Sequence, residues 1–540
     1  MRVYELNVLA NDVFTVELGG SRGARSLPGL LAALGAGEAV DFPDLRPHQE
    51  HPWHAFLVQL AALVVHRAGE GRIERSAEEW RSGLLELAGD AGEDAWRLVV
   101  EDLSRPALFQ TPVPEGSLAG YRHATAEPDA IDVVLTTRNH DVKQRRMRHP
   151  RPEHWVYALV TLQTFEGFMG RGNYGIARMN GGFASRPCLA AAPDLGWSAR
   201  FRRDVRVWLE AREDLVYSYG YPDSGGAALL WTLPWDGDKG SRRDPRACDP
   251  FFLEVCRRVR LEERDGALTA HLAPTAAAFL EAGDLKGVTG DVWTPIKEDR
   301  AGPSALAVSA SGFSYRLMTD LLFAESYHRP PAFGVRADDG PAPWILARVL
   351  ARGQGKTEGY HERLLPVPRR ARSMLRSPQK RAAVGNLARH RVEQVREVQR
   401  RALRPALCAL LQGGGEKLDL RDARPQPWVD RHDRAVDDVF FPDLWEGAGL
   451  EDRHEADRRW DRRLVELAWQ VLADALRAVP IPQARRFRAT ARADHLFRGS
   501  AAKHFGGVEV LRGLPPIDEP GAAAPARGAA APAEVTPSDE

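Results

Sequence analysis

The sequence is poor in cysteine, which limits the kinds of site it can contain. Its 540 residues include only four cysteines, Cys188, Cys248, Cys256 and Cys408. None of them forms a CxxC pair, so neither a zinc knuckle nor a dithiol redox motif is predicted. A chain of this length can bury a large core without disulfides, and we expect it to reside in a reducing cytoplasm.

The sequence also lacks an excess of charge and a long hydrophobic run. Lys+Arg and Asp+Glu both number 74, so net charge alone predicts no polyanionic partner. The most apolar stretch, residues 55–65 (AFLVQLAALVV), is too short to span a bilayer, and we expect it to form a buried helix. The N-terminal residues alternate like a strand and lack the basic and apolar regions of a signal peptide.

No catalytic constellation stands out. The doublets His140-Asp141 and His432-Asp433 are isolated, and the HEADR segment at His454 lacks the second histidine of HExxH. No Ser/His/Asp or Cys/His signature is present. We therefore expect a protein that is not an enzyme and that holds neither a metal nor a cofactor.

Two glycine motifs leave an enzymatic alternative open. GRGNYG (residues 170–175) matches GxGxxG in its letters, but it follows a predicted helix rather than a strand. GQGKTEG (residues 353–359) contains the GKT of a phosphate loop, although Leu350 stands where the first glycine of GxxxxGK[ST] belongs. A nucleotide hydrolase using Lys356 and Thr357, or a metal-dependent nuclease using the His-Asp doublets, are the alternative functions.

Periodicity predicts an α+β protein, with a large mixed N-terminal domain followed by a C-terminal four-helix bundle. We expect a mixed domain over residues 1–376, a helical bundle over residues 377–507 and a disordered tail over residues 508–540, which is rich in Pro, Ala and Gly. Long helices are predicted in residues 154–169, 388–411 and 460–479, and strands in residues 201–209, 267–273 and 305–318.

Arginine is bunched rather than spread. The segment 138–151 (RNHDVKQRRMRHPR) has six Lys or Arg residues and one acidic residue. The segment 369–381 (RRARSMLRSPQKR) has six Lys or Arg residues and no acidic residue. Such runs are often solvated surface, but flexible arginine-rich segments also suit a phosphate backbone. Gly181 and Gly182 lie between them in sequence and indicate a backbone that something approaches closely. Together these features favour a nucleic-acid partner.

Six blocks in order carry a resemblance to a known family. They read VDFPDLRPHQEHPWHAFLVQLAALVV, RPALFQTPV, RMNGGFASRP, GDVWTPI, GFSYRLMTDLLF and RGQGKTEGYHERLLPVP. In order and spacing they resemble the large subunit (CasA) of the type I-E CRISPR Cascade complex, up to about Gly507. The family's large subunit is not catalytic. It recognises the protospacer-adjacent motif (PAM) of double-stranded DNA from the minor groove and helps to separate the strands.

The resemblance implies three DNA-contacting elements. The first is a glycine loop that matches Asn180, Gly181, Gly182 and Phe183. The second is a lysine on a β-hairpin before GDVWTPI, for which Lys286 is the candidate. The third is a wedge that normally carries a glutamine. Its matching residues are Gln354, Gly355, Lys356, Thr357 and Glu358.

The resemblance also implies partners. A basic loop is expected to meet the 5′ end of the CRISPR RNA and the backbone subunits. Its candidate residues are Arg138, Asn139, Lys143, Arg145, Arg146 and Arg148. The small subunit, the backbone subunits and the subunit that holds the 5′ handle are expected partners, together with target duplex DNA and a helicase–nuclease; no membrane is expected. Some family members hold zinc through a cysteine cluster, which Cys248 and Cys256 cannot form by themselves.

Overall fold

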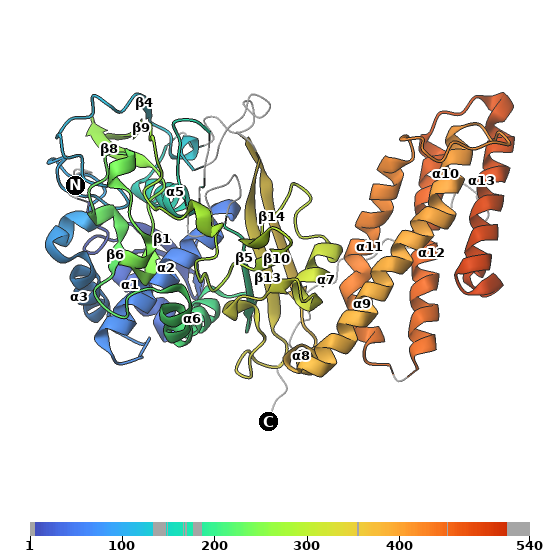
Figure 1. Ribbon diagram of the computed structural model, residues 1–540, viewed down its shortest axis with the longest axis horizontal. Coiled ribbons are helices and arrows are strands. Elements are labelled where there is room, and N and C mark those ends of the chain that lie inside the picture. The colour runs from blue at the N-terminus through green and yellow to red at the C-terminus, as the bar shows by residue number, and fades with distance from the viewer. Residues whose placement is uncertain are drawn as a thin grey trace. The chain divides into compact units, whose positions relative to one another are not determined.

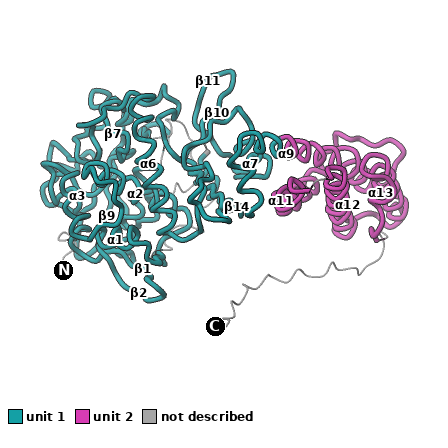
Figure 2. Tube along the Cα trace, turned by 90° about the horizontal axis from the view of Figure 1, so that it is seen from below, with its two compact units in different colours: residues 1–385 teal, residues 386–540 magenta. Residues whose placement is uncertain are grey.

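The computed structural model describes residues 6–132, 147, 149–165, 167, 170–176, 186–353, 356–450 and 452–515. The chain divides into two compact units, Met1–Gly385 and Asn386–Glu540 (Figure 2). The division falls inside one long helix, α9 (Pro378–Val398). Among the described residues, no helix is long and apolar enough to cross a membrane.

The first unit combines helices with small sheets (Figure 1). Its α-helices are α1 (Leu27–Ala36), α2 (Pro47–Ala68), α3 (Ala77–Ala88), α5 (Pro152–Phe165), α6 (Trp197–Tyr219), α7 (Tyr315–Phe323) and α8 (Arg369–Arg376), followed by the start of α9. Its 3₁₀ helices are η2 (Gly89–Trp96), η3 (Pro128–Ala130), η4 (Leu230–Thr232), η5 (Lys239–Ser241), η6 (Pro245–Ala247), η7 (Gly283–Leu285) and η8 (Pro331–Phe333).

The strands of the first unit form five sheets. In spatial order the strands are β2 (Ser21–Arg25), β1 (Phe14–Leu18) and β3 (Val40–Asp41); β11 (Gly302–Ala305), β10 (Ile296–Asp299) and β12 (Tyr327–His328); β14 (Lys356–Pro366), β13 (Trp344–Gly353) and β5 (Cys188–Ala192); β4 (His123–Thr125), β9 (Ala267–Ala273) and β8 (Arg258–Arg264); and the parallel pair β6 (Ala227–Leu229) and β7 (Cys248–Leu253).

Helix α2 forms the centre of the first unit. Every side chain from His51 to Val65 is buried, and the helix packs against α3, α5, α6 and β7. A helix that is apolar on all sides must be enclosed by other elements, so the expectation of a buried helix at residues 55–65 is confirmed. Trp53 lies at its start and contacts Phe14, Phe56 and Tyr157 at ring-centroid distances of 5.0–5.2 Å.

Two of the expected strands are not strands. Residues 201–209 (FRRDVRVWL) belong to α6, because Phe201, Val205, Trp208 and Leu215 recur at helical spacing on its buried face. The β-branched valines suggested a strand, and the longer apolar stripe outweighs that local preference. Residues 305–318 are also largely not a strand: β11 ends at Ala305 and α7 begins at Tyr315. The strand expected at residues 267–273 is β9, as predicted.

The second unit is helical and contains the rest of α9, the π-helical turn η9 (Gln399–Leu403), α10 (Arg404–Leu411), α11 (Gln426–Gly447), α12 (Arg453–Ala478), α13 (Gln483–His504) and η10 (Gly507–Leu511). The π-turn precedes Pro405, which has no N–H for the regular helical ladder, so α9 and α10 continue as one rod. With α11, α12 and α13 the described part forms a four-helix bundle, as expected. The tail expected to be disordered lies, from residue 516, outside the described residues.

The bundle core is built from aromatic side chains at its helix contacts. Trp460 of α12 packs edge-on against Phe440 of α11, at 5.8 Å between ring centroids, and Trp469 contacts Phe497 of α13 at 5.4 Å. The helix expected over residues 460–479 lies within α12, and its apolar residues at helical spacing are buried from Leu464 to Ala475. Arg391 of α9 lies over the Trp460 ring, 5.0 Å from its centroid, so its stem covers the core while its guanidinium is attracted to the ring face.

Candidate functional site

Several residues of the expected site lie outside the described residues. They are Asn180, Gly181, Gly182 and Phe183 of the glycine loop, Gln354 and Gly355 of the wedge, and Arg138, Asn139, Lys143, Arg145, Arg146 and Arg148 of the basic loop. The structure does describe Lys286, Thr357, Glu358, the backbone of Lys356 and the segments that flank each loop. The site is therefore built from the anchors of these loops.

Arg186 anchors the segment that leaves the glycine loop. Its fully buried guanidinium donates from Nε to Asp291 Oδ2 at 2.5 Å and from Nη1 to Gln59 Oε1 at 3.1 Å. It also lies over the rings of Phe165 and Trp293, 5.1 and 5.2 Å from their centroids. Burial alone would lower the pKa of Arg186, but the negative charges of Asp291 and Glu254, together with the hydrogen bond to Asp291, raise it, so the cation is kept.

Backbone bonds extend this anchor into the block that reads GDVWTPI. The Leu189 N–H donates to the Trp293 carbonyl at 3.0 Å, and Thr294 Oγ1 donates to the Pro187 carbonyl at 3.0 Å. Trp293 in turn donates from Nε1 to Asp204 Oδ2 of α6 at 2.9 Å. Two blocks about 105 residues apart in sequence are thus joined directly, which no local pattern could predict.

The segment that enters the glycine loop is held by close packing. Gly170 and Gly172 have φ of +104° and +85°, in the region that favours glycine. At Gly175 a Cβ would overlap Arg257 Nη1 and lie 2.6 Å from the Cys256 carbonyl oxygen. The buried Arg257 donates to the carbonyls of Gly167 and Cys256 at 2.5 and 2.8 Å. These glycines therefore have structural roles, and GRGNYG follows α5 rather than a strand, so it is not a dinucleotide fingerprint.

The wedge segment is the end of a long β-hairpin. Strands β13 and β14 pair from Trp344↔Pro366 to Gly353↔Lys356, so only Gln354 and Gly355 connect them. On its other edge β13 pairs with β5, the strand that follows Arg186. The exit of the glycine loop and the wedge hairpin therefore belong to one three-stranded sheet.

The base of the hairpin turn is tied to the start of the basic loop. Arg352, which is buried, donates from Nη1 to Thr357 Oγ1 at 2.5 Å and from Nη2 to the Asp132 carbonyl at 3.3 Å. Burial lowers the pKa of Arg352 to about 10, which still leaves it charged at neutral pH. Asp132 accepts from Gln49 Nε2 at 2.6 Å and contacts His48 Nε2 at 2.8 Å, and the basic segment 138–151 begins six positions later in the sequence.

Lys286 lies in a turn rather than on a hairpin strand. It caps the 3₁₀ helix η7 with φ of +49°, and its carbonyl accepts from the Ala305 N–H at 2.8 Å. Its exposed ammonium donates to the Ala301 carbonyl at 3.2 Å, beside the turn of the β10–β11 hairpin. The expected hairpin follows the GDVWTPI block instead of preceding it, because residues 283–286 close a short helical turn.

An open cavity of about 670 Å³ adjoins Lys286. Arg246 adds a second cation to its wall, and Asp244, Glu281 and Asp284 add carboxylates. Tyr221 closes one side by donating from its hydroxyl to the Thr289 carbonyl at 2.8 Å. Lys286 therefore projects from a wall of mixed charge and is not neutralised by an ion pair among the described residues.

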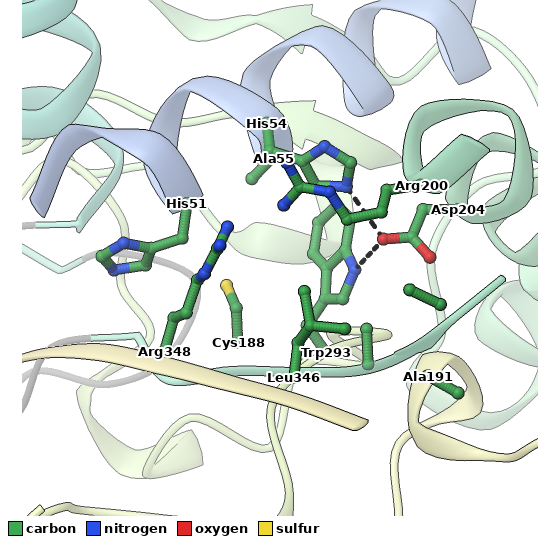
Figure 3. Close-up of a pocket in the computed structure, with 12 residues that line it drawn as sticks. His51, His54, Ala55, Cys188, Ala191, Arg200, Asp204, Trp293, Leu346 and Arg348 are labelled. Atoms are coloured by element: carbon green, nitrogen blue, oxygen red, sulfur yellow. Dashed lines mark hydrogen bonds and ion pairs between the residues drawn. The ribbon is translucent and has the colours of Figure 1, made fainter. Parts of the chain in front are cut away.

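A small internal cavity of about 30 Å³ lies beneath the sheet, between α2, α6 and β13 (Figure 3). Two groups converge there on one oxygen, Asp204 Oδ2: His54 Nε2 at 3.0 Å and Trp293 Nε1 at 2.9 Å. Across the cavity Arg348 of β13 forms ion pairs with Glu50 at 3.2 Å and Glu362 at 2.7 Å. This network was not predicted from the sequence.

Burial shifts the pKa values of the titratable groups around this cavity toward their neutral forms. Burial raises the pKa of the Cys188 thiol well above its usual range, and burial lowers the pKa of His51 well below it. A protonated thiol is a poor nucleophile, so burial leaves Cys188 without the lowered pKa of an activated cysteine. Burial also lowers the pKa of Arg200 to about 10. The hydrogen bonds and ion pairs of this network hold α2, α6 and the sheet together.

The enzymatic alternatives find no support in the described geometry. Lys356 and Thr357 begin strand β14, whereas a phosphate loop must open a helix whose N–H groups face the phosphate. Over the described ranges, no group of three or more His, Cys, Asp or Glu side chains could hold a metal ion. His432 is buried against Gln399 Nε2 at 3.2 Å and the Leu464 carbonyl at 3.4 Å. His140-Asp141 lies outside the described residues.

No family model and no curated protein sequence matches the chain. Solved structures do match it over nearly its whole length. It is 14% identical to Thermus thermophilus CasA (Cse1), with a TM-score of 0.59 over 93% of this chain and 100% of that one. It is 15% identical to Cse1 from Acidimicrobium ferrooxidans, with a TM-score of 0.56 over 92% of this chain and 98% of that one. It is 13% identical to Thermobifida fusca Cse1, with a TM-score of 0.63 over 92% of this chain and 98% of that one. The chain therefore has the fold of the CasA/Cse1 proteins.

Proposed function

We propose that this chain is the large subunit of a type I-E CRISPR Cascade complex and recognises the PAM of double-stranded target DNA. The observation that carries the proposal is the agreement between two independent features. The six ordered sequence blocks resemble CasA, and the whole described fold is similar to CasA and Cse1 structures. At this low identity a shared fold does not transfer a function by itself, so the residues must supply the rest.

The glycine loop is proposed to read the minor groove. Asn180–Phe183 offer a backbone without bulky side chains at Gly181 and Gly182, which suits a narrow groove. Support comes from the anchors on either side: Gly175 is packed against Arg257, and Arg186 is paired with Asp291. A loop held rigidly at both ends loses less conformational entropy on binding than a free one. Readout there discriminates weakly between bases, so the guide RNA supplies most of the sequence specificity.

Lys286 is proposed as the second contact. Its ammonium is exposed, and its backbone is fixed by the Ala305 N–H and by the turn η7. It lies five positions before Asp291, the partner of the glycine-loop anchor. The two elements are thus linked through a single short segment, as a pair of contacts to one stretch of DNA requires.

The turn of the β13–β14 hairpin is proposed as the wedge that separates the strands. Gln354 and Gly355 are the two residues between the paired strands in sequence, and Lys356, Thr357 and Glu358 follow on β14. Unpairing the first bases costs a few kcal/mol, which an inserted turn and captured phosphates offset. A paired hairpin, tied next to its turn by Arg352, is stiff enough to bear that load.

The basic loop, with Arg138, Asn139, Lys143, Arg145, Arg146 and Arg148, is proposed to bind the 5′ end of the CRISPR RNA and the adjoining subunits. Asp132, six positions before Arg138, is fixed to the wedge hairpin because its carbonyl accepts from Arg352. The assembled complex then presents the opened DNA to a helicase–nuclease, so the chain itself is not catalytic. A nuclease or ATPase activity of the purified chain that disappears in Lys356→Ala or His432→Ala would overturn this part.

Reconstitution tests the proposal. The remaining Cascade subunits and a CRISPR RNA are assembled with and without this chain, and binding to duplex and to single-stranded targets is compared. We expect the chain to join the RNA-containing complex and to be needed for PAM-dependent duplex binding, whereas binding to the single strand persists without it. A chain that fails to join, or duplex binding that ignores both the chain and the PAM, contradicts the proposal.

A further inference from the structure

A second basic surface lies on α8 and the start of α9, which follow β14 in sequence. We call it the basic face; it consists of Arg369, Arg370, Arg372, Arg376, Lys380 and Arg381. No acidic residue occurs between Glu362 and Glu393. None of the elements proposed to contact the PAM or the guide RNA includes these residues.

The basic face is presented outward. Helix α8 buries Ala371 and Leu375, which are four positions apart, and so turns Arg369, Arg370 and Arg376 to the solvent. Lys380 at the start of α9 is also exposed. Among the described residues, these four cations form no ion pair.

The face is carried by a fixed support rather than by a flexible tail. Val367, between Pro366 and Pro368, is buried and donates its N–H to the Pro343 carbonyl at 2.8 Å. Strand β14 therefore leads directly into α8 (Figure 1). Arg372 is bound to the Ala337 carbonyl at 2.5 Å, so it steadies the helix. Cations held in place in this way pay less entropy on binding an anion.

Local charge is uncompensated at the second end of the face. Arg329 follows β12 and donates from Nη1 to the Leu322 carbonyl at 3.1 Å. Burial lowers its pKa, and the nearby charge of Arg381 lowers it further. Two guanidinium groups thus lie near each other and raise the local positive potential, which an incoming anion would relieve.

We propose that the basic face binds the phosphate backbone of duplex DNA about one helical turn away from the wedge. This inference rests on the proposed function. The eleven residues of β14, Lys356–Pro366, and then Val367 and Pro368 separate the hairpin turn from α8. At about 3.3 Å per residue the strand alone spans about 36 Å, close to the roughly 34–36 Å of one turn of B-DNA. A duplex that opens at the hairpin turn can therefore present its next backbone ridge to α8.

The side chains of the face favour a duplex over the other polyanions. Five of the six are arginines, whose planar guanidinium groups bind phosphate oxygens in pairs. Single-strand sites also need exposed aromatic rings for stacking, and none of the large exposed hydrophobic residues described in the chain falls within residues 369–381. A protein partner would need an apolar centre, which the face lacks as well.

The test compares duplex targets that differ in the length of flanking DNA on the PAM side. Assembled complexes carry either the wild-type chain or Arg369→Gln/Arg370→Gln/Arg376→Gln. With a flank of about 20 base pairs, roughly two turns, we expect the variant to bind about tenfold more weakly and its salt slope to fall by up to about 2.7, at roughly 0.9 for each phosphate contact. With a flank of about four base pairs the wild-type complex has no such contact, so the two should bind equally.

A matched control removes three exposed arginines elsewhere in the first unit, Arg25→Gln/Arg67→Gln/Arg264→Gln, with the same change in net charge. This control should bind long and short flanks like wild type, and all three chains should melt at the same temperature. An equal loss on both flank lengths, a loss of CRISPR RNA from the complex, or a loss only of helicase–nuclease binding would each overturn the proposal. Wild-type binding that ignores the PAM would contradict the proposed function instead, and the flank comparison would still judge the basic face.

Discussion

Arg186 and Asp291 form a buried ion pair between two loops that are 105 positions apart in sequence, with 2.5 Å between Nε and Oδ2. The side chains are 0% and 1% exposed, so neither charge can turn to water if its partner is removed. Because this pair fixes the exit of the glycine loop to the segment that carries Lys286, its loss should be felt in both stability and DNA binding.

Asp291→Asn should lower the free energy of unfolding by about 3–5 kcal/mol, since it leaves the Arg186 guanidinium buried without a counter-charge. Denaturant unfolding followed by tryptophan fluorescence measures this. Arg186→Met/Asp291→Asn should cost less than the sum of the two single changes, because the double variant contains no stranded charge. Strict additivity would mean that the two residues do not act as a pair.

Gly175→Ala should be strongly destabilising, by about 2 kcal/mol or more, because the new methyl group overlaps the buried Arg257 and the Cys256 carbonyl. Gly240→Ala is the matched control. No atom lies within 4 Å of a Cβ placed there, so alanine should be neutral or stabilise by up to about 1 kcal/mol. Similar melting temperatures for the two variants would refute the close packing at Gly175.

Asp461 gives the bundle a pH dependence. Burial, followed by the charge of Asp457, raises its pKa from 3.8 to about 6. Between these values the folded chain keeps a proton that the unfolded chain releases, so this residue lowers stability as the pH rises from about 4 to 6. In the wild type, Gln394 Nε2 donates to Asp461 Oδ1 at 2.9 Å, and Asp461→Asn keeps an oxygen that can accept this bond. The variant should be more stable than wild type above pH 6 but equal to it near pH 4. Urea unfolding across pH 4–8 measures the difference; a constant gap would contradict the raised pKa.

Neutralising the basic loop should weaken binding without changing which PAM is preferred. Arg145→Gln/Arg146→Gln/Arg148→Gln removes phosphate contacts but touches no base, so affinity should fall for all targets alike. The salt slope for binding of this chain to the RNA-containing complex should fall by up to about 2, at roughly 0.7 for each contact to a single-strand phosphate of the RNA. Binding isotherms at several salt concentrations measure both. A loss confined to some PAM sequences would show that the loop reads bases instead.

Local patterns predicted the elements whose signal is confined to one stretch of chain. The buried helix α2, the strand β9 and the helix α12 were all predicted, because the pattern of apolar residues that indicates each one lies within a short stretch of sequence. Residues 201–209 were misread because their valines favour a strand locally, and only the stripe reaching Leu215 identifies a helix. Tertiary packing decides such cases.

The arrangement of the site could not be predicted in the same way. Arg186, Arg257 and Arg352 are buried anchors, yet arginine is ordinarily exposed and nothing local distinguishes these three. Their partners lie elsewhere in the sequence or on backbone carbonyls. Lys286 was chosen as a candidate by its place before GDVWTPI, but its position in a helical turn depends on the Gly283 and Ala305 backbone bonds, which no motif specifies.

The most direct test of the central claim places a β-branched side chain in the glycine loop. Gly181→Val and Gly182→Val are compared with the alanine variants in assembled complexes of equal melting temperature and CRISPR RNA content. If the loop lies in the minor groove, valine should greatly reduce binding to duplex target, alanine should reduce it less, and binding to the single-stranded complementary target should be unchanged. Equal losses on duplex and single strand, or valine variants that no longer fold, would contradict a role in PAM recognition and leave these glycines as residues of a turn.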